Sequence, residues 1–412
     1  MTAPLKVLYI DSDGPFGGAS RSLYEAMNAF PEGSAERYFV MQDGTARNFY
    51  DRLAKGMIVT RGLTRFDNTR VGHYRSVRWI VLLREISYFP YTVAALLKAQ
   101  KQWPQIDLIH ANEITQIIPG LIAKALFKVP LVIHTRSLQR TDTKSRRTRW
   151  LHRQLRRNAD AIVAIDEGVR ATLPTDLSVD VIHNSFSPEP SETPDPAYLA
   201  QLDQLRPSAL KVGFVGNLHR SKGMQELFDA AKIVKAEGHD VQFLIVGGTT
   251  SEVRGLKWWL LNKLGLAQNM RGELYAAIAA AGLEGDFLML GPTSDIQRVY
   301  PRMDVLAFPS YFDAPGRPVF EAAFFGVPSI VAVRAPREDT VIDGETAIAI
   351  PDPDPRQLAD AIIHFARDHS EVNRMGNNAR ILAARNFRPE VNANALVALY
   401  HRVVDAAHSR MT

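Results

Sequence analysis

The sequence predicts an α/β protein made of two doubly wound domains, and three observations support this fold class. Short runs rich in Val, Ile and Leu alternate with longer stretches of helical period, as strands and helices do around a parallel sheet. These runs form two series with a proline-rich stretch between them. The chain has 412 residues, more than one ordinary α/β core contains. We therefore expect two parallel sheets facing a central cleft, which is lined by the loops after the strands.

The predicted strands are short and apolar, as buried parallel strands are. In the first half of the chain they are residues 7–10, 38–41, 57–60, 108–110, 131–134, 161–165 and 179–183. In the second half they are residues 212–215, 243–246, 287–290, 305–308, 329–333 and 347–350.

The stretch between the two series has the composition of a domain linker. Within residues 185–206 prolines recur among acidic and polar residues, which disfavours regular structure. We assign the first domain to residues 1–190, the linker to 191–206 and the second domain to 207–384. The closing helices, about residues 385–412, are expected to pack back on the first domain.

The composition excludes some classes of site and partner. The chain has no cysteine, which rules out disulfides, thiolate metal sites and cysteine nucleophiles. The run from Leu5 to Ile10 ends at Asp11 and is too short for a secretory signal. The longest apolar region, residues 79–97, is interrupted by Pro90 and two charges, so it falls short of an uninterrupted membrane span. We expect a cytoplasmic protein, with attachment to the cytoplasmic face of a membrane left open.

A loop rich in Gly and Pro follows the predicted strand 305–308 and leads into a helix that begins near Pro318. Pro suits the start of a helix because its missing amide hydrogen would have no partner there. Free amides in residues 316–319 can hold an anionic or hydroxyl-rich ligand. Glu321 lies one turn into this helix, where it can accept hydrogen bonds from a ribose diol.

At these residues the sequence resembles glycosyltransferase family 4, the retaining GT-B enzymes whose motif has two glutamates separated by seven residues. Asp313 and Glu321 hold the two acidic positions, and a Gly-x-Pro follows at residues 326–328. The resemblance implies two Rossmann-like domains and catalytic roles for both acids. Aspartate is one methylene shorter than glutamate, so its reach toward a sugar hydroxyl differs. The residues implied in donor binding here are Gly316, Arg317, Pro318, Val319 and Glu321.

The second domain opens with a strand, a glycine turn and a basic segment. Gly216 and Asn217 follow the predicted strand, and Lys222 precedes the next helix. Lysine is unfavourable at a helix N-terminus unless an anion is present, and the resemblance implies that Lys222 neutralises a diphosphate leaving group. Asn217 stands where the family carries arginine, so His219 or Arg220 is a candidate for the missing charge, and we include Arg220 in the donor-binding set. Gly291, after the predicted strand 287–290, completes the predicted donor-binding set.

In the first domain two consecutive glycines, Gly17 and Gly18, lie between the first strand and a helix. This loop lacks the Gly-x-Gly-x-x-Gly pattern, which argues against a nicotinamide site. It resembles the glycine loop of family 4, which implies backbone amides close to a phosphate or to the transferred sugar. His134 ends a predicted strand and matches the family's histidine, whose implied catalytic role is a hydrogen bond to the transferred sugar. Polar residues at neighbouring strand ends, listed next, are candidate acceptor-binding residues: His110, Asn112, Glu113 and Arg136.

Two segments combine cations with apolar residues. Residues 136–157 contain nine Lys and Arg residues against one acid, and residues 254–264 contain two tryptophans among cations. Such segments suit an anionic membrane or a lipid-diphosphate acceptor, although a solvated charged face or an internally packed tryptophan pair explains them too. The net charge of +5 also favours anionic partners. Nucleic acid is disfavoured because no recognised binding module accompanies the charge.

The resemblance implies transfer of a sugar from a nucleoside diphosphate sugar to an acceptor hydroxyl, with retention at the anomeric carbon. The acceptor is expected to be a glycan or lipid-linked glycan in surface polysaccharide or glycoconjugate assembly. We expect no cofactor and no metal, because no cluster with ligand spacing is visible. Two alternatives stay open: a nucleotide-sugar epimerase or hydrolase of the same architecture, and a non-catalytic nucleotide-sugar-binding subunit.

Overall fold

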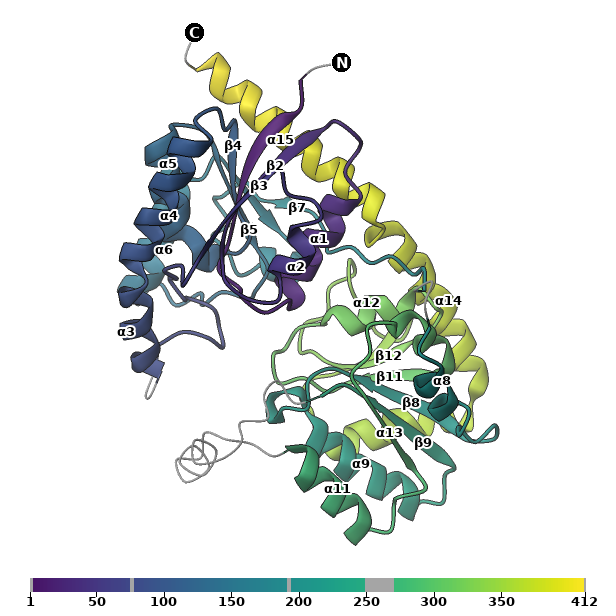
Figure 1. The fold of residues 1–412 in the computed structure, drawn as a ribbon. Coiled ribbons are helices and arrows are strands. Elements are labelled where there is room, and N and C mark those ends of the chain that lie inside the picture. The colour runs from purple at the N-terminus through teal and green to yellow at the C-terminus, as the bar shows by residue number, and fades with distance from the viewer. Residues whose placement is uncertain (1–2, 75–77, 191–193, 249–269, 411–412) are drawn as a thin grey trace. The chain divides into compact units, whose positions relative to one another are not determined.

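A computed structural model describes residues 3–74, 78–190, 194–248 and 270–410 of the chain. It divides into two compact units, which we call unit 1 (Met1–Ser187 with Asn386–Thr412) and unit 2 (Pro188–Arg385). Each unit contains a parallel sheet flanked by helices, which confirms the predicted α/β class (Figure 1). The predicted aromatic and basic segment 254–264 lies outside the described residues.

The described part of unit 1 has a seven-stranded parallel sheet in the order β3-β2-β1-β4-β5-β6-β7. Its strands are β1 (Leu5–Asp11), β2 (Ala35–Gln42), β3 (Gly56–Thr60), β4 (Leu108–Ala111), β5 (Leu131–Thr135), β6 (Ala161–Ala164) and β7 (Asp180–Val181). Its α-helices are α1 (Gly18–Asn28), α2 (Arg47–Tyr50), α3 (Trp79–Ser87), α4 (Phe89–Gln102), α5 (Ile117–Phe127), α6 (Arg146–Asn158), α7 (Glu167–Arg170) and α15 (Pro389–Ser409).

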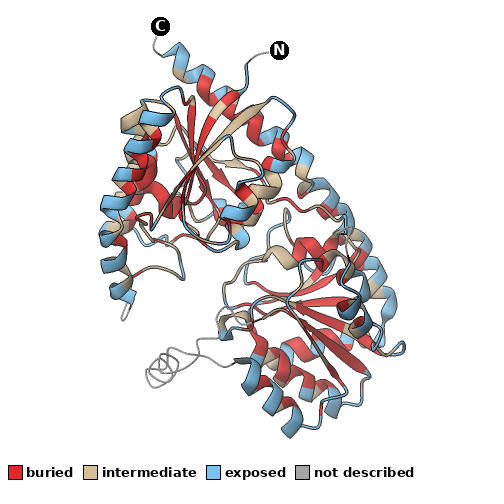
Figure 2. Cartoon of the chain, viewed as in Figure 1, coloured by how far each residue is buried: buried red, intermediate tan, exposed pale blue. Residues whose placement is uncertain are grey.

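Side chains that alternate along the central strand β1 belong to two separate cores. Val7 and Tyr9 pack with side chains of α1 and α15, whereas Leu8 and Ile10 pack with those of α4, α5 and α6. Successive side chains of a strand point to opposite faces, so an apolar run without alternation serves two helix layers at once. The strands are accordingly mostly buried in Figure 2.

The last helix, α15, covers the unit 1 sheet although it lies at the other end of the sequence. Leu396, Tyr400 and Val403 recur at helical spacing and are buried in the same core as α1. Just before this helix, the chain contacts the segment that follows β7. There the amide of Phe186 donates to the carbonyl of Phe387 at 3.1 Å. Residues 386–412 therefore belong to unit 1.

Unit 2 has a six-stranded parallel sheet in the order β10-β9-β8-β11-β12-β13 within its described residues. Its strands are β8 (Leu210–Val215), β9 (Val241–Val246), β10 (Phe287–Gly291), β11 (Val305–Phe308), β12 (Ser329–Ala332) and β13 (Ala347–Ile350). Its α-helices are α8 (Pro196–Leu202), α9 (Met224–Ala236), α11 (Met270–Ala280), α12 (Arg317–Ala323), α13 (Pro355–Arg367) and, reaching into unit 1 by one residue, α14 (His369–Asn386).

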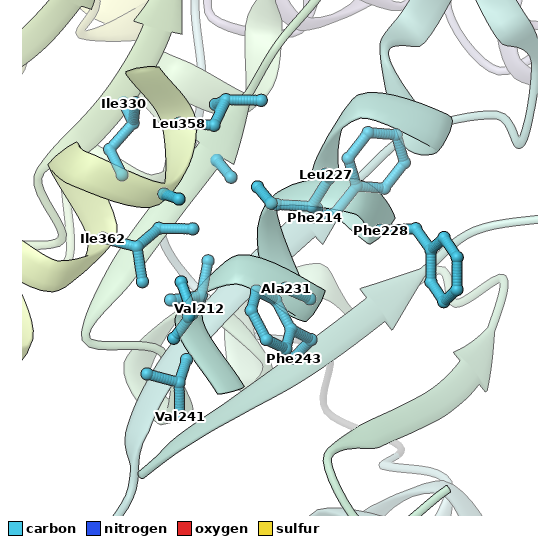
Figure 3. Close-up of a cluster of buried hydrophobic side chains, with 14 of the residues drawn as sticks. Val212, Phe214, Leu227, Phe228, Ala231, Val241, Phe243, Ile330, Leu358 and Ile362 are labelled. Carbon is cyan, nitrogen blue, oxygen red and sulfur yellow. The ribbon is translucent and has the colours of Figure 1, made fainter. Parts of the chain in front are cut away.

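One core of unit 2 lies between a face of its sheet and the helices α9, α11 and α13. Figure 3 shows Val212 and Phe243 of the sheet meeting Leu227 of α9 and Ile362 of α13. This packing fixes β8 and β9, whose carboxyl ends carry the turns described next. All thirteen predicted apolar runs overlap strands of the structure.

Candidate functional site

Two loops of unit 2 that were predicted to bind the donor touch each other. Gly223 has a φ of +74°, and a Cβ there would lie 1.8 Å from the carbonyl oxygen of Pro309. The amide of Tyr311 donates to the carbonyl of Ser221 at 3.0 Å. Only glycine permits this close approach, which joins the turn after β8 to the loop after β11.

Lys222 lies in the 3₁₀ turn Arg220–Lys222, directly before this contact. Its Nζ lies 4.4 Å from the ring centroid of Phe312 and 5.5 Å from that of Phe308. Among the described residues no carboxylate forms an ion pair with this lysine. Burial lowers its pKa, because a partly desolvated ammonium is less stable. The lysine is therefore held by aromatic faces beside the acidic motif and is available to an anion.

Asp313 is held by a backbone contact. Its Oδ1 accepts from the amide of Arg334 at 2.8 Å, and its Oδ2 lies 3.4 Å from the Arg334 guanidinium. Asp313 also has a φ of +54°, a conformation that aspartate tolerates better than most residues. The structure thus gives the shorter acid a role in fixing the loop after β11 to the end of β12.

Glu321 is 3% exposed, and both of its carboxylate oxygens have partners. Tyr300 donates to Oε2 at 2.8 Å, and Arg317 forms a two-nitrogen ion pair with Oε1 at 2.9 Å. The expected helix start is present, since Gly316 caps α12 and Pro318 occupies its first turn. The amide of Val319 donates to the carbonyl of Gly316 at 3.0 Å.

The remaining predicted donor residues of unit 2 lie in turns at the carboxyl ends of its strands. Gly216 and Gly247 pack backbone to backbone, since a Cβ on Gly247 would lie 1.9 Å from the Gly216 carbonyl oxygen. Gly291 has a φ of +75° and accepts from the amide of Gly247 at 2.9 Å. Asn217 is exposed, and Arg220 lies 3.5 Å from Glu273 in an exposed ion pair. The charge of Arg220 is therefore directed toward α11.

In unit 1, buried polar side chains converge where β1 and β4 end. Asp11 is fully buried, and its Oδ2 accepts from Tyr50 at 2.6 Å, from Ser20 at 3.0 Å and from Asn112 at 3.2 Å. Burial, followed by the charge of Asp13, raises the pKa of Asp11. Sequence analysis missed Asp11 and Tyr50, although Asp11 is the last residue of a buried strand.

Arg136 contacts two of the other predicted acceptor residues, Asn112 and Glu113, and so joins them to this group. Its Nε donates to the carbonyl and side-chain oxygens of Asn112 at 3.0 and 2.9 Å, and its Nη1 donates to Asn184 at 2.8 Å. Its amide lies 3.3 Å from Glu113 Oε1. Burial raises the pKa of Glu113 to about 7, since the surrounding hydrogen bonds only partly offset desolvation.

His134 carries a buried hydrogen-bonding atom that no described group satisfies. Arg136 Nη2 lies 3.3 Å from His134 Nδ1, and a guanidinium can only donate, so Nδ1 accepts and the proton of the neutral ring is on Nε2. Burial lowers the pKa of His134 well below its usual value, so the ring is neutral. Its Nε2 has no partner in the structure. A ligand oxygen would satisfy this donor.

The rings of His110 and His134 are neighbours, with 5.4 Å between their centroids. Its Nδ1 is 2.6 Å from the hydroxyl of Tyr400 on α15. Burial lowers the pKa of His110 to about 3, so this ring is also neutral. Tyr400 therefore supports the histidine pair from the C-terminal helix, a contact between residues 290 positions apart.

Backbone contacts constrain the glycine loop of unit 1 more at Gly14 than at Gly17. A Cβ on Gly14 would lie 2.5 Å from the carbonyl oxygen of Asp43, whereas at Gly17 the nearest atom would be 3.9 Å away. Gly17 caps α1, and Gly18 is its first residue. The fold itself thus requires glycine at position 14, whereas a Cβ at position 17 would make only an ordinary van der Waals contact.

Family models match both halves of the chain. Residues 204–382 match the model described as Glycosyl transferases group 1, and residues 16–189 match that of Glycosyltransferase Family 4. The chain belongs to glycosyltransferase family 4. The recognition made from the acidic motif is confirmed, and the protein is a nucleotide-sugar-dependent glycosyltransferase.

Curated relatives of this glycosyltransferase are distant. It is 25% identical over 364 residues to a D-inositol 3-phosphate glycosyltransferase of Corynebacterium diphtheriae, covering 82% of this chain and 79% of that protein. It is 24% identical to the lipopolysaccharide core biosynthesis mannosyltransferase LpsB of Rhizobium meliloti, covering 72% and 79%. The match to the capsular polysaccharide biosynthesis glycosyltransferase CapM of Staphylococcus aureus, at 25% identity, covers 46% of this chain and 45% of CapM.

Solved glycosyltransferase structures share the fold. Anabaena Alr3699/HepE in complex with UDP has a TM-score of 0.72 at 21% identity, covering 97% of this chain and 100% of that chain. The same protein in complex with UDP-glucose has a TM-score of 0.69 at 22% identity, covering 96% and 98%. The GT-B fold predicted from the sequence is confirmed.

Proposed function

We propose that this glycosyltransferase moves a hexosyl-type unit from a nucleoside diphosphate sugar to a hydroxyl of a glycan or lipid-linked glycan, with retention at the anomeric carbon. Relatives named for capsular polysaccharide and lipopolysaccharide core biosynthesis support a surface-glycan acceptor. The UDP-glucose complex of the structurally similar Anabaena protein makes UDP-sugars the first donors to test.

The position of Lys222 carries this proposal. Its ammonium is partly desolvated, lies against Phe308 and Phe312, and forms no ion pair with a carboxylate in the described chain. A diphosphate would supply the missing countercharge. Negative charge develops on the diphosphate as the sugar leaves, so a fixed cation there stabilises the transition state more than the ground state.

The acids of the motif are proposed to position groups and not to accept protons. Asp313 is engaged by Arg334, and Glu321 by Tyr300 and Arg317. We assign Glu321, with Arg317, to the orientation of the ribose, and Asp313 to the shape of the loop that faces the transferred sugar. Gly316, Pro318 and Val319 form the start of α12 beside these acids, and we assign them to donor binding there.

We propose that the sugar contacts of unit 1 come from His134 and the side chains joined to it. The Nε2 proton of His134 is a buried donor without a partner in the structure, which suits a sugar hydroxyl. Arg136, Asn112 and Glu113 then form the wall on which an acceptor hydroxyl is oriented. His110 acts through His134 and is a positioning residue.

In the proposed reaction the bond between the anomeric carbon and the diphosphate oxygen breaks, and its electron pair stays with the diphosphate. The acceptor oxygen forms the new bond on the same face of the sugar, and its proton passes to the leaving phosphate. Such a step needs no separate general base. No group of three or more His, Asp or Glu side chains in metal-binding arrangement occurs in the described residues, and we propose that the reaction proceeds without a metal.

A donor screen tests the proposal. Purified protein is incubated with UDP-, GDP- and ADP-sugars, with and without glycan or lipid-linked acceptors, and released nucleoside diphosphate is measured in the presence of EDTA. We expect release from one donor class that depends on an acceptor and survives EDTA. Acceptor-independent release would favour a hydrolase, and conversion of the donor without release would favour an epimerase. Binding of the donor without turnover under every condition would favour a non-catalytic subunit.

We also propose that the acceptor is presented at the cytoplasmic face of a membrane. A chain with pI near 9.3 is attracted to anionic lipid, and a lipid-linked acceptor would be held in that surface. The sequence suggested residues 136–157 as the contact. In the structure two of its arginines face inward, since Arg136 lies in the polar network and Arg147 stacks over Phe66 and Tyr74.

A further inference from the structure

Helices α3 and α4 of unit 1 carry a concentration of exposed apolar side chains. Of the twelve large apolar side chains that are exposed in the described residues, eight lie between Val71 and Leu97. The most exposed are Ile80 (65%), Leu83 (67%) and Ile86 (59%), and Trp79 is 52% exposed. An apolar patch of this kind marks an interaction surface, because single exposed side chains are normally scattered.

These side chains lie on one face of the helix pair, which we call the α3–α4 face. The face consists of Trp79, Ile80, Leu83, Ile86, Phe89 and Leu97. Spacings of three, four and eight residues place them in one stripe along a nearly continuous helix. Figure 2 shows this helix pair, at the edge of unit 1, largely exposed along its outer side.

The opposite side of the helices is fixed in the protein, so the stripe cannot turn inward. Glu85 is buried and accepts from the amide of Arg65 at 3.0 Å. Thr92 is buried and accepts from the amide of Thr64 at 2.8 Å. Leu96 packs in the core beneath the sheet.

The segment Trp79–Gln102 is long and apolar enough to cross a membrane by length and composition, with 22% of its most apolar window buried. Its inward side nevertheless packs on the sheet through α4, and this packing is incompatible with lipid on all sides. A helix that is apolar on its outer side and anchored on its inner side is suited to lie in the plane of a bilayer surface.

The charges around the face are those that an anionic surface attracts. Residues 61–102 contain eight Lys and Arg residues and two acids. Both acids are neutralised within the protein, since Asp67 lies 3.9 Å from Arg78 and Glu85 lies 2.9 Å from Arg84. Three further cations are exposed nearby: Lys98 and Lys101 on α4, and Arg61 directly after β3.

The basic helix α6 adjoins the same region. Arg147 of α6 lies 4.2 Å from the ring centroid of Tyr74, and the Tyr74 ring lies 6.2 Å from that of Trp79. The start of the α3–α4 face therefore borders the basic segment that the sequence analysis singled out. A second copy of the chain would bring one cationic rim against another, which disfavours self-association there.

We propose that the α3–α4 face docks flat on an anionic lipid bilayer, with its apolar stripe among the acyl chains and its cations at the headgroups. The purpose of this docking rests on the proposed function: it holds the enzyme at the surface that carries a lipid-linked acceptor. The docking itself depends only on the described side chains.

Vesicle co-sedimentation tests this proposal with the full chain. The wild type is compared with a double variant, Ile80→Glu with Leu83→Glu, on vesicles of phosphatidylcholine alone and with roughly 30% phosphatidylglycerol. Ile381→Glu is the matched control, because Ile381 is 66% exposed on α14 of unit 2. Circular dichroism and thermal melting establish that each variant is folded.

We expect the wild type and Ile381→Glu to bind the anionic vesicles, and the double variant to bind at least tenfold more weakly. Binding should also weaken as salt rises from about 0.05 to 0.5 M. Equal binding by the folded double variant, or no wild-type binding at low salt, overturns the proposal. So does a concentration-dependent dimer in sedimentation velocity that the double variant abolishes, because the face would then cover a second copy.

Turnover of donor with a soluble acceptor separates this proposal from the proposed function. If the double variant loses vesicle binding and keeps turnover, docking is supported independently of catalysis. If the wild type binds vesicles but turns over no donor, docking stands and the proposed function fails.

Discussion

Single side chains of this glycosyltransferase have environments that the motif alone does not reveal. Lys222 was singled out because lysine is unfavourable at a helix start, and the structure places it on Phe308 and Phe312. Asp313 is expected to reach a sugar, and in the structure its carboxylate also accepts from the backbone amide of Arg334, 21 residues away. The motif predicted which residues belong to the site. It did not predict their partners, because these come from other loops at the carboxyl ends of the strands.

The ionisation of Glu113 gives a prediction at the residue scale. Its folded pKa of about 7 is above its unfolded value, so it stabilises the fold below its unfolded pKa and loses this contribution as pH rises to about 7. We expect the stability of the wild type relative to Glu113→Gln to fall by roughly 2–3 kcal/mol between about pH 4.5 and 7.5. Urea unfolding of both proteins across this range measures the difference.

Subtracting the stability of Glu113→Gln from that of the wild type separates the contribution of Glu113 from those of other buried groups. His110 and His134 have lowered pKa values and change stability in the opposite direction, which affects both proteins alike. Parallel pH profiles for the two proteins would show that folding does not raise the pKa of Glu113 and would contradict the prediction.

At the scale of elements, the join between β11 and α12 depends on glycine at position 316. A Cβ there would lie 2.4 Å from Cζ of Phe308. We expect Gly316→Ala to lower the free energy of unfolding by about 1–3 kcal/mol, because the ring must move out of a packed site. Chemical denaturation gives this value directly.

Gly285→Ala serves as the control for Gly316→Ala, since no atom lies within 4 Å of the Cβ position of Gly285. Its stability should stay within about 0.5 kcal/mol of the wild type or rise slightly. Equal losses in the two variants would mean that the Phe308 contact has no energetic weight.

Helix α15 contributes to the site of unit 1 through one hydroxyl. Removing it with Tyr400→Phe leaves Nδ1 of buried His110 without its partner at 2.6 Å. We expect a loss of about 1–2 kcal/mol in unfolding free energy and a lower kcat, whereas Tyr275→Phe, at an exposed position of α11, changes neither. Unfolding curves and donor turnover for both variants test this. Wild-type behaviour of Tyr400→Phe would exclude a supporting role for α15.

Elements differed in how far the sequence could predict them. Strands such as β11 were predictable because parallel strands are buried on both faces and read as uninterrupted apolar runs. The α3–α4 face was not, because apolar side chains such as Leu96 lie on the buried side as well, together with the charged Glu85. The hydrogen bonds of Glu85 and Thr92 to the loop after β3 show which side faces outward.

For the whole molecule, contacts between distant parts of the chain decide the chemistry. The buried network of unit 1 joins Asp11, Tyr50, Asn112 and Arg136, contributed by four separate segments. The sequence supplied Asn112 and Arg136 as candidates because they follow strands. It could not supply Tyr50, which ends α2, is not directly preceded by a strand and reaches Asp11 only through the tertiary fold.

The central claim is that this protein transfers a sugar from a nucleotide donor and that Lys222 stabilises the departing diphosphate. The most direct measurement is acceptor-dependent kcat/KM for the wild type, Lys222→Ala and Lys222→Arg, with the donor class found by screening. We predict a loss of about 10²–10³-fold in Lys222→Ala and a smaller loss in Lys222→Arg, with melting temperatures unchanged. Turnover by folded Lys222→Ala at the wild-type rate would contradict the account.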